Sequence, residues 1–322
     1  MRSATLLTVS AALVTSALAG SYARTEHIAG AGFYNAFEFQ AIPDPTNGRV
    51  NYVDQATAQR TNLTFASASP DKFVLRADAS TVLSDAGALG RNSVRIRSRN
   101  TYATHVAVFD VAHMPQACGT WPAIWETDEE SWPNGGEIDI VEGVNDQGAN
   151  AVTLHTSAGC TMPAARTQTG TAGDQLNCDT ALGDAGCGVD LSSTRPATYG
   201  PAFNAAGGGW YAIERTPAFI NVWFWPRSAG DVPADVKAGG GRVDTATWGT
   251  PAANFPDTSC DIAKLFTAHN IIINLTFCGD WAGTQDLYAG AGCPATCISY
   301  VDANPTAFTN AYFEFNAINI YK

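Results

Sequence analysis

The sequence predicts an all-β protein built as a sandwich or a barrel. Roughly a dozen short segments have the apolar alternation or the continuous apolar runs of half-buried and buried strands, as in residues 94–97 and 106–109. Gly, Pro, Asn, Asp and Ser separate these segments as turn signals. Helical segments do not alternate with them, which argues against βαβ units and a parallel sheet.

The elements follow from this pattern in chain order. The expected strands are residues 33–39, 49–53, 72–76, 93–98, 105–111, 137–144, 151–155, 210–214, 219–225, 270–277 and 311–321. Residues 260–269 are expected to form a short surface helix, because Ile262, Leu265 and Phe266 have helical spacing. Residues 156–209 and 226–259 are rich in Gly, Ala, Thr, Asp and Pro and are expected to be loops that line a functional cleft.

Residues 1–19 have the pattern of a secretory signal peptide. Arg2 precedes an apolar run over residues 4–18, and Ala17-Leu18-Ala19 precedes Gly20 as a small-x-small cleavage site. The apolar run is too short to span a bilayer, and the chain ends without a hydrophobic tail. We therefore expect a secreted, monomeric protein without a membrane anchor, in which residues 20–322 form a single domain.

The eight cysteines indicate up to four disulfides, because an exported chain meets an oxidising environment. The sequence alone does not fix their pairing, although the short separations favour local bridges between Cys293 and Cys297 and between Cys178 and Cys187 over an unbridged state. The spacing that zinc sites need is missing, so we expect no metal and no cofactor. The net charge of −12, from 18 basic and 30 acidic residues, disfavours nucleic acid and anionic lipid and indicates an uncharged partner.

The candidate chemistry lies in residues 136–142, GEIDIVE. In a regular strand Glu137 and Asp139 share one face, while Ile138 and Ile140 point into the opposite, apolar layer. Glu142 is out of register by one residue. A β-bulge at residues 140–141 would return Glu142 to the face of Glu137 and Asp139, and bulges are frequent beside active sites.

Three carboxylates on one face repel each other, and no Lys or Arg lies between them to relieve the repulsion. Such repulsion raises the pKa of one carboxyl group, which stays protonated as a general acid, while another stays ionised as a nucleophile. A retaining glycosidase needs such a pair, about 5 to 5.5 Å apart. A solvated acidic strand edge is the alternative interpretation.

Neighbouring residues favour the catalytic interpretation. Trp121, Trp125 and Trp132 form an aromatic cluster close to Glu137 in the sequence, and aromatic faces stack on sugar rings. His155 lies on the next expected strand, from which it could reach Glu142. The sequence has no Gly-x-Ser-x-Gly elbow and no phosphate-binding loop, which leaves few competing chemistries.

The motif resembles the E-x-D-x-x-E signature of glycoside hydrolase family 16, in the laminarinase form with the extra residue. Four further segments are similar to basidiomycete fungal endo-β-1,3(4)-glucanases of the laminarinase 16A type: DPTNGRVNYV (44–53), RNSVRIR (91–97), GTWPA (119–123) and CGDWAG (278–283). The resemblance covers nearly the whole chain after residue 19. It implies a β-jelly-roll sandwich of two antiparallel sheets with a curved open cleft, and retaining cleavage of laminarin-like β-1,3-glucan and of mixed-linkage glucan.

The resemblance also implies roles for individual residues. It makes Glu137 the nucleophile, Glu142 the acid/base, and Asp139 the residue that hydrogen-bonds to the nucleophile and tunes it. The implied substrate-binding residues are Trp125, Trp132, Trp281, His155, Asn35 and Arg95.

Two other functions share these features. A non-catalytic glucan-binding lectin could have the same fold, but it would have no need for both glutamates and the bulge. A transglycosylase shares the glycosyl-enzyme intermediate and differs only in its acceptor. Of the two glycosylation sequons, Asn62-Leu63-Thr64 near a turn is expected to be used, whereas Asn274-Leu275-Thr276 is expected to be buried in a strand.

Overall fold

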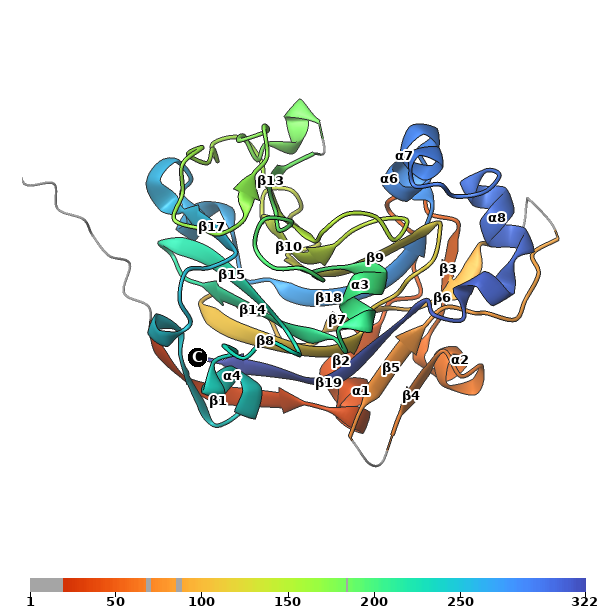
Figure 1. The fold of residues 1–322 in the computed structure, drawn as a ribbon, viewed down its shortest axis with the longest axis horizontal. Helices are drawn as coiled ribbons and strands as arrows, with labels where there is room; N and C mark the ends of the chain where they lie inside the picture. Colours follow the sequence, from red (N-terminus) through yellow and green to blue (C-terminus); the bar gives the residue numbers. More distant parts are fainter. Residues whose placement is uncertain (1–19, 68–70, 85–88, 184) are drawn as a thin grey trace, which may run out of the picture.

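Two large antiparallel sheets face each other and enclose the main core (Figure 1). The computed structural model describes residues 20–67, 71–84, 89–183 and 185–322, so the predicted signal peptide lies outside the described residues. The predicted all-β sandwich is confirmed. None of the helices in these ranges has the length and apolar character that crossing a bilayer requires.

The sheet that carries the acidic motif has eight strands. In spatial order they are β12 (Thr171–Ala172), β13 (Cys187–Asp190), β11 (Ala151–His155), β10 (Glu137–Glu142), β9 (Thr120–Thr127), β18 (Asn270–Phe277), β7 (Arg95–Ser98) and β2 (Phe37–Phe39). The motif strand β10 therefore lies inside the sheet, where both neighbours fix its position.

The opposite sheet has nine strands. Seven follow in the order β16 (Arg242–Asp244), β1 (Ser21–Ile28), β19 (Tyr312–Tyr321), β8 (His105–His113), β14 (Gly209–Arg215), β15 (Phe219–Pro226) and β17 (Ala253–Pro256). The last two strands extend from β19, and they are β5 (Phe73–Arg76) and β4 (Thr64–Ala66). A separate parallel pair is formed by β3 (Val50–Tyr52) and β6 (Arg91–Ser93).

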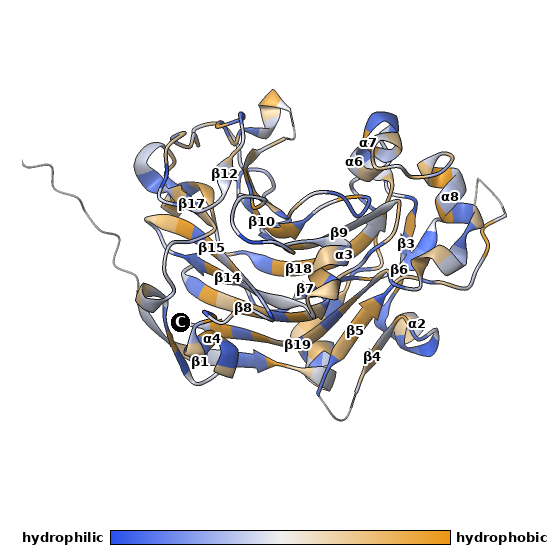
Figure 2. Ribbon diagram, in the orientation of Figure 1, coloured by the Kyte–Doolittle hydropathy of each residue, from blue (hydrophilic) through white to orange (hydrophobic). Residues whose placement is uncertain are grey.

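Residues between the two sheets form the main core, and apolar residues mark strands of both sheets in Figure 2. From β10 this core takes Ile138, Ile140 and Val141, all fully buried. Two core-facing residues in succession show that β10 departs from strict alternation. A second cluster includes Trp223 and Trp225 of β15, which pack edge-on against Trp248. These two tryptophans have the core role that their apolar strand suggests.

The described residues also form eight short α-helices. They are α1 (Phe33–Ala36), α2 (Gln55–Arg60), α3 (Gly200–Ala205), α4 (Ala234–Ala238), α5 (Ile262–Leu265), α6 (Gly279–Ala282), α7 (Gln285–Gly290) and α8 (Cys297–Ala303). The predicted strand at 33–39 is wrong over its first four residues, which are α1. There Phe33 packs its ring on Phe73, so tertiary packing overrides the aromatic strand signal.

Both predicted loop regions contain more regular structure than expected. Residues 156–209 include β12, β13 and α3, and residues 226–259 include α4, β16 and β17. The predicted helix at 260–269 is confirmed only as α5, whose Ile262 and Leu265 are buried. The strands β1 and β9 were not among the predicted elements.

Four disulfides use all eight cysteines. The Cys178–Cys187 bridge is confirmed, and Cys160 pairs with Cys260. The predicted Cys293–Cys297 bridge is wrong. Cys297 is the first residue of α8 and bonds to Cys278 after β18, whereas Cys293 follows α7 and bonds to Cys118 before β9.

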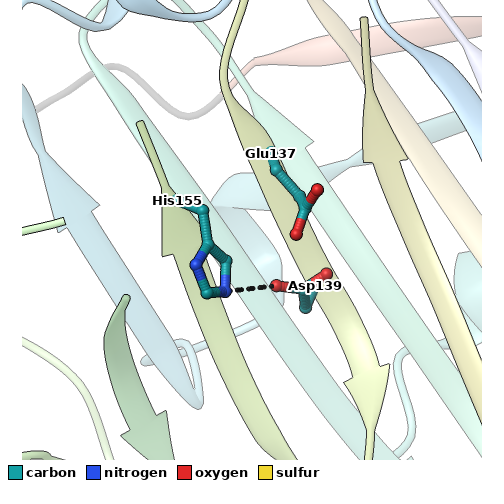
Figure 3. Close-up of side chains that lie close together, drawn as sticks. All are labelled: Glu137, Asp139 and His155. Atoms are coloured by element: carbon teal, nitrogen blue, oxygen red, sulfur yellow. Dashed lines mark ion pairs between the residues drawn. The ribbon is translucent and has the colours of Figure 1, made fainter. Parts of the chain in front are cut away.

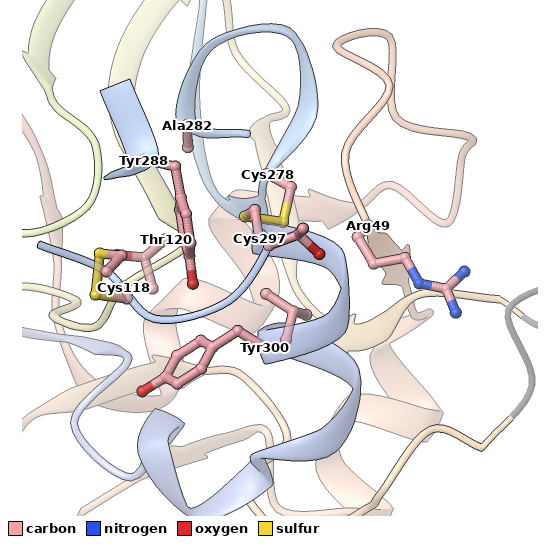
Figure 4. The surroundings of a disulfide bond; sticks show 12 residues. Arg49, Cys118, Thr120, Cys278, Ala282, Tyr288, Cys297 and Tyr300 are labelled. Carbon is pink, nitrogen blue, oxygen red and sulfur yellow. A yellow bond between two sulfur atoms is a disulfide. The ribbon is translucent and has the colours of Figure 1, made fainter. Parts of the chain in front are cut away.

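These last two bridges fasten α6, α7 and α8 to the sheet at the ends of β9 and β18. Both belong to a small core of their own, in which Tyr288 is fully buried beside the cysteines (Figure 4). We call residues 278–297 the disulfide platform. In Figure 1 its helices α6 and α7 lie at one side of the eight-stranded sheet, and β13 lies at the other.

Candidate active site

A β-bulge in β10 gathers the acidic side chains. Glu137 and Asp139 pair with Thr127 and Trp125 of β9, and the register then shifts, so that Val141 pairs with Ile124 and Glu142 with Ala123. Ile140 is the inserted residue. The predicted bulge is confirmed, and it separates the apolar side chains in the core from the carboxylates on the other face.

Each glutamate accepts a hydrogen bond from a tryptophan indole. Trp132 Nε1 donates to Glu137 Oε2 (2.9 Å), and Trp121 Nε1 donates to Glu142 Oε1 (2.8 Å). Both glutamates are half-buried. Each carboxyl group therefore has one oxygen held by an indole and one oxygen left for other chemistry.

Asp139 lies beside Glu137 and faces His155 (Figure 3). His155 is the register partner of Glu137 on β11, and its Nε2 lies 3.2 Å from Asp139 Oδ2. The sequence placed His155 near Glu142, but its direct contact is with Asp139. Glu137, Asp139 and His155 each offer one ligand atom, and these atoms lie within 4.8 Å of one another. These three side chains could hold a cation, although the sequence predicted none.

The pKa of each of the three carboxyl groups is raised. Burial raises the pKa of Glu137, and the charges of Asp139 and Glu142 raise it further. Burial and the charge of Asp139 raise the pKa of Glu142 in the same way, and burial raises that of Asp139. The indole hydrogen bonds act in the opposite direction on both glutamates. The site therefore favours holding a proton on part of the group, which suits paired acid and base chemistry.

Trp125 is fixed on the neighbouring strand β9. Its Nε1 donates to Asn274 Oδ1 (2.7 Å), and the Arg95 guanidinium lies 5.0 Å from its ring centre. Arg95 is buried and donates to Glu129 (2.6 Å) and to Gln40 (2.8 Å). These contacts hold the half-buried indole of Trp125 in one orientation.

The loop between β9 and β10 carries Trp132, whose side chain is 45% exposed. Its Gly135 carbonyl accepts hydrogen bonds from His269 Nε2 (2.6 Å) and from the Thr267 N–H (3.0 Å). The next carbonyl, that of Gly136, accepts from Thr127 Oγ1 (2.8 Å). Gly136 has φ +79°, and a Cβ there would lie 2.6 Å from the Leu265 carbonyl oxygen. The loop is therefore anchored immediately before Glu137.

The chain is similar to known proteins over most of its length. The model of an XgeA-like catalytic domain of glycoside hydrolase family 16 matches residues 37–321. The chain belongs to glycoside hydrolase family 16. It is a catalytic domain of this family, and the recognition made from its sequence is confirmed.

Solved family 16 structures are similar over most of the chain. Laminarinase 16A from Phanerochaete chrysosporium, with two 6-O-glucosyl-laminaritriose molecules in its donor and acceptor sites, is 57% identical. It has a TM-score of 0.91, and the match covers 94% of this chain and 100% of that one. An elongating family 16 β-1,3-glucosyltransferase is 38% identical, with a TM-score of 0.85 and coverages of 94% and 100%.

Longer relatives match this family 16 domain as well. The endo-1,3(4)-β-glucanase xgeA of Emericella nidulans is 38% identical over 313 residues, which are 94% of this chain and 48% of that protein. A probable glycosidase of Schizosaccharomyces pombe is 41% identical over 94% of this chain and 70% of its own length. The chain thus spans about half of the first of these relatives.

The other predicted binding residues of the family 16 domain lie at its margins. Trp281 on α6 is half-buried and meets Trp121 edge-on, with ring centres 5.5 Å apart. Asn35 is exposed on α1, beside β2 at the edge of the sheet, and β9, β18 and β7 lie between β2 and β10. The structure therefore brings Trp281 near the acidic group through Trp121, but it does not bring Asn35 there.

Sequence reasoning missed the direct contact between Trp121 and Glu142. The sequence contains a signal for this contact, because side chains an even number of residues apart in a strand face the same side, and Trp121 lies four residues before Trp125 on β9. It also missed Asn274 as the partner of Trp125, having considered that residue only as a sequon. Asn274 is buried, as predicted, whereas Asn62 of the other sequon is exposed.

Proposed function

We propose that this protein is a secreted, monomeric, retaining endo-glucanase that hydrolyses β-1,3-glucan of the laminarin type, and also mixed-linkage β-1,3-1,4-glucan. Residues 20–322 act as one catalytic domain. The observation that carries the proposal is the bulge at Ile140, which puts Glu137, Asp139 and Glu142 on one face with an indole donor on each glutamate.

Glu137 is the nucleophile of this proposal. Trp132 occupies its Oε2, which leaves Oε1 to attack the anomeric carbon. The C–O bond to the leaving sugar breaks as the ester bond to Glu137 forms, which gives a covalent glycosyl-enzyme. Asp139 lies beside Glu137 and holds a proton that stabilises the nucleophile when it is ionised, while His155 orients Asp139.

Glu142 is the acid/base. Trp121 occupies its Oε1, so Oε2 carries the proton and gives it to the leaving oxygen. In the second half-reaction Glu142 takes a proton from water, the oxygen of this water attacks the anomeric carbon, and the bond to Glu137 breaks. The raised pKa of Glu142 keeps it protonated before the first step.

The glucan chain lies across this face of the sheet. Trp132 is the most exposed of the aromatic residues here and offers a face for stacking on a sugar ring next to the nucleophile. Trp125 and Trp281 extend the contact along the chain, and Arg95 serves by fixing Trp125. Asn35 and His155 complete the proposed set of contacts, with Asn35 at its outer end.

Paired substitutions test the two roles. Glu137→Ala is expected to abolish turnover of laminarin while the protein stays folded. Glu142→Ala is expected to suppress turnover of natural glucans but to affect substrates with good leaving groups less, because these need no acid. Folding is checked by circular dichroism. Normal laminarin hydrolysis by Glu137→Ala would refute the proposal.

A transglycosylase is the second candidate, because the glucosyltransferase with a TM-score of 0.85 shares this fold. The higher identity to laminarinase 16A favours hydrolysis. Product analysis on laminarin, with and without excess oligosaccharide acceptor, separates the two. Products longer than the starting chains as the main outcome would assign the transferase. Sugar release from laminarin, lichenan and curdlan side by side measures the linkage preference.

A further inference from the structure

After the bulge, the backbone of β10 is no longer paired with the neighbouring strand β11. β10 pairs with β9 on both sides of the inserted residue, but it pairs with β11 only through Glu137, Ile138 and Asp139. Continuing the β11 register would put Asn150 opposite Glu142. The backbone N–H and C=O groups of this stretch are buried and need partners, so something else must supply them.

The side chain of Asn150 takes over from the ladder. Its Nδ2 donates to the Ile140 carbonyl (2.8 Å), and its Oδ1 accepts from the Glu142 N–H (2.8 Å). One carboxamide thereby spans the bulge from the inserted residue to the acid/base. Asn150 is fully buried.

Asn150 is itself held in place by the adjoining chain. Its N–H donates to Thr198 Oγ1 (3.0 Å), and its carbonyl accepts from the Leu191 N–H (3.0 Å). Its position therefore does not depend on the two bonds that it makes to β10.

We infer that Asn150 is a positioning residue that sets the direction in which Glu142 leaves the bulge. The inference rests on the proposed role of Glu142 as acid/base. Asparagine offers a donor and an acceptor on one short fork. An ionised aspartate keeps only the acceptor, and leucine, which has a similar volume, keeps neither. Asn150 acts through the backbone of Glu142 and has no contact with substrate in this role.

Hydrogen exchange tests the two hydrogen bonds from the Asn150 side chain to β10 without any activity assay. In Asn150→Leu the Glu142 amide loses its acceptor, so exchange in peptides covering 138–144 is expected to rise by about tenfold or more, a rise set by local opening of the bulge. Asn150→Asp keeps that acceptor, so the increase in exchange of these peptides is expected to be smaller in this variant. Unchanged exchange in Asn150→Leu would overturn the inference.

Leaving-group dependence tests the consequence for Glu142. For Asn150→Leu, kcat/KM on laminarin is expected to fall by about 10²-fold, the loss that a displacement near 1 Å can cause. On a 2,4-dinitrophenyl laminaribioside, which needs no acid, the loss is expected to stay below about tenfold. Equal losses on both substrates would contradict the inference.

Asn204 provides a matched control. Its carboxamide also bridges a backbone N–H and a carbonyl, both of Met114, at 2.9 Å each, but it lies on α3, outside the acidic strand. Asn204→Leu is expected to lower thermal stability and to reduce activity on both substrates by the same factor. If Glu142→Ala itself shows no leaving-group dependence, the proposed function fails, and the exchange experiment still decides whether Asn150 holds the bulge.

Discussion

The two indole hydrogen bonds predict that two conservative substitutions move opposite limbs of the pH–activity profile. Trp121→Phe removes the donor from Glu142 and Trp132→Phe removes the donor from Glu137, while each keeps an aromatic face. Both donors lower the pKa of their glutamate, so their removal raises it. The acid must be protonated and the nucleophile ionised. Trp121→Phe therefore moves the alkaline limb to higher pH, and Trp132→Phe moves the acidic limb to higher pH.

The size of the shift follows from the charge of the acceptor. A hydrogen bond to a charged group contributes about 1.5–3 kcal/mol, and a neutral one about half of that. The difference between the ionised and protonated forms is then about 0.7–1.5 kcal/mol, which corresponds to about 0.5–1 pKa unit. Trp132 is 45% exposed, so solvent weakens its bond and the shift of the acidic limb is expected to be the smaller one.

The assay is kcat/KM on laminarin from pH 3 to pH 10, measured for the wild type and for both variants at constant ionic strength. A Trp223→Phe variant, altered in the separate tryptophan cluster of β15, controls for general loss of an indole and should move neither limb. If Trp121→Phe shifts the acidic limb instead, the roles of Glu137 and Glu142 are exchanged. If neither variant shifts a limb, the indoles do not tune the carboxyl groups.

Three further outcomes are expected. Burial lowers the pKa of His269 to about 4 from its ordinary 6.5, so this residue binds a proton in the unfolded chain but not in the folded one between these values, and its contribution to the free energy of unfolding should fall by about 3 kcal/mol as the pH drops through this window. The raised pKa values of Glu137, Asp139 and Glu142 act in the opposite direction in both wild type and His269→Gln, so the check is the difference in unfolding free energy between the two proteins in denaturant titrations, which should fall by that amount. Replacing both cysteines of the Cys160–Cys260 bridge by alanine should lower the free energy of unfolding by about 4.7 kcal/mol, and replacing those of Cys178–Cys187 should lower it by about 2.6 kcal/mol. The difference arises because the bridges span sequence separations of 100 and 9, and the longer loop restricts the entropy of the unfolded chain more. Equal losses in calorimetry would refute this reasoning. Asn62→Gln should remove glycan mass from protein secreted by a eukaryotic host, whereas Asn274→Gln should not, because Asn62 is exposed and Asn274 is buried against Trp125. A glycan found on Asn274 by mass spectrometry would contradict the burial of this residue.

The central strand was predictable because its constraints are local. Strand parity and one extra residue suffice to predict a bulge at residues 140–141, and the structure has it at Ile140. The prediction of a catalytic role for the carboxylates rests on the lack of interleaved cations. The overall sandwich followed from the many short strands for the same reason.

The sequence-based predictions that were wrong depend on contacts between residues far apart in the chain. Phe33 begins a helix because its ring stacks on Phe73, forty residues away, and no local pattern reports that contact. Cys293 and Cys297 are close in the sequence, but each pairs with a cysteine at the end of a different sheet strand. The partner of His155 was misjudged because the register of β11 against β10 depends on where the bulge falls within the pairing.

The disulfide platform has a consequence for how this protein can be altered. The Cys278–Cys297 bond joins the two ends of this segment to each other, and the Cys118–Cys293 bond ties it to the residues before β9. Its buried side chains share a small core with Leu275 and Phe277 of β18. An exchange of the segment between Cys278 and Cys297 therefore replaces Trp281, and it must keep Cys293 for the bond to Cys118 and an apolar side chain in place of Tyr288 to cover Leu275 and Phe277.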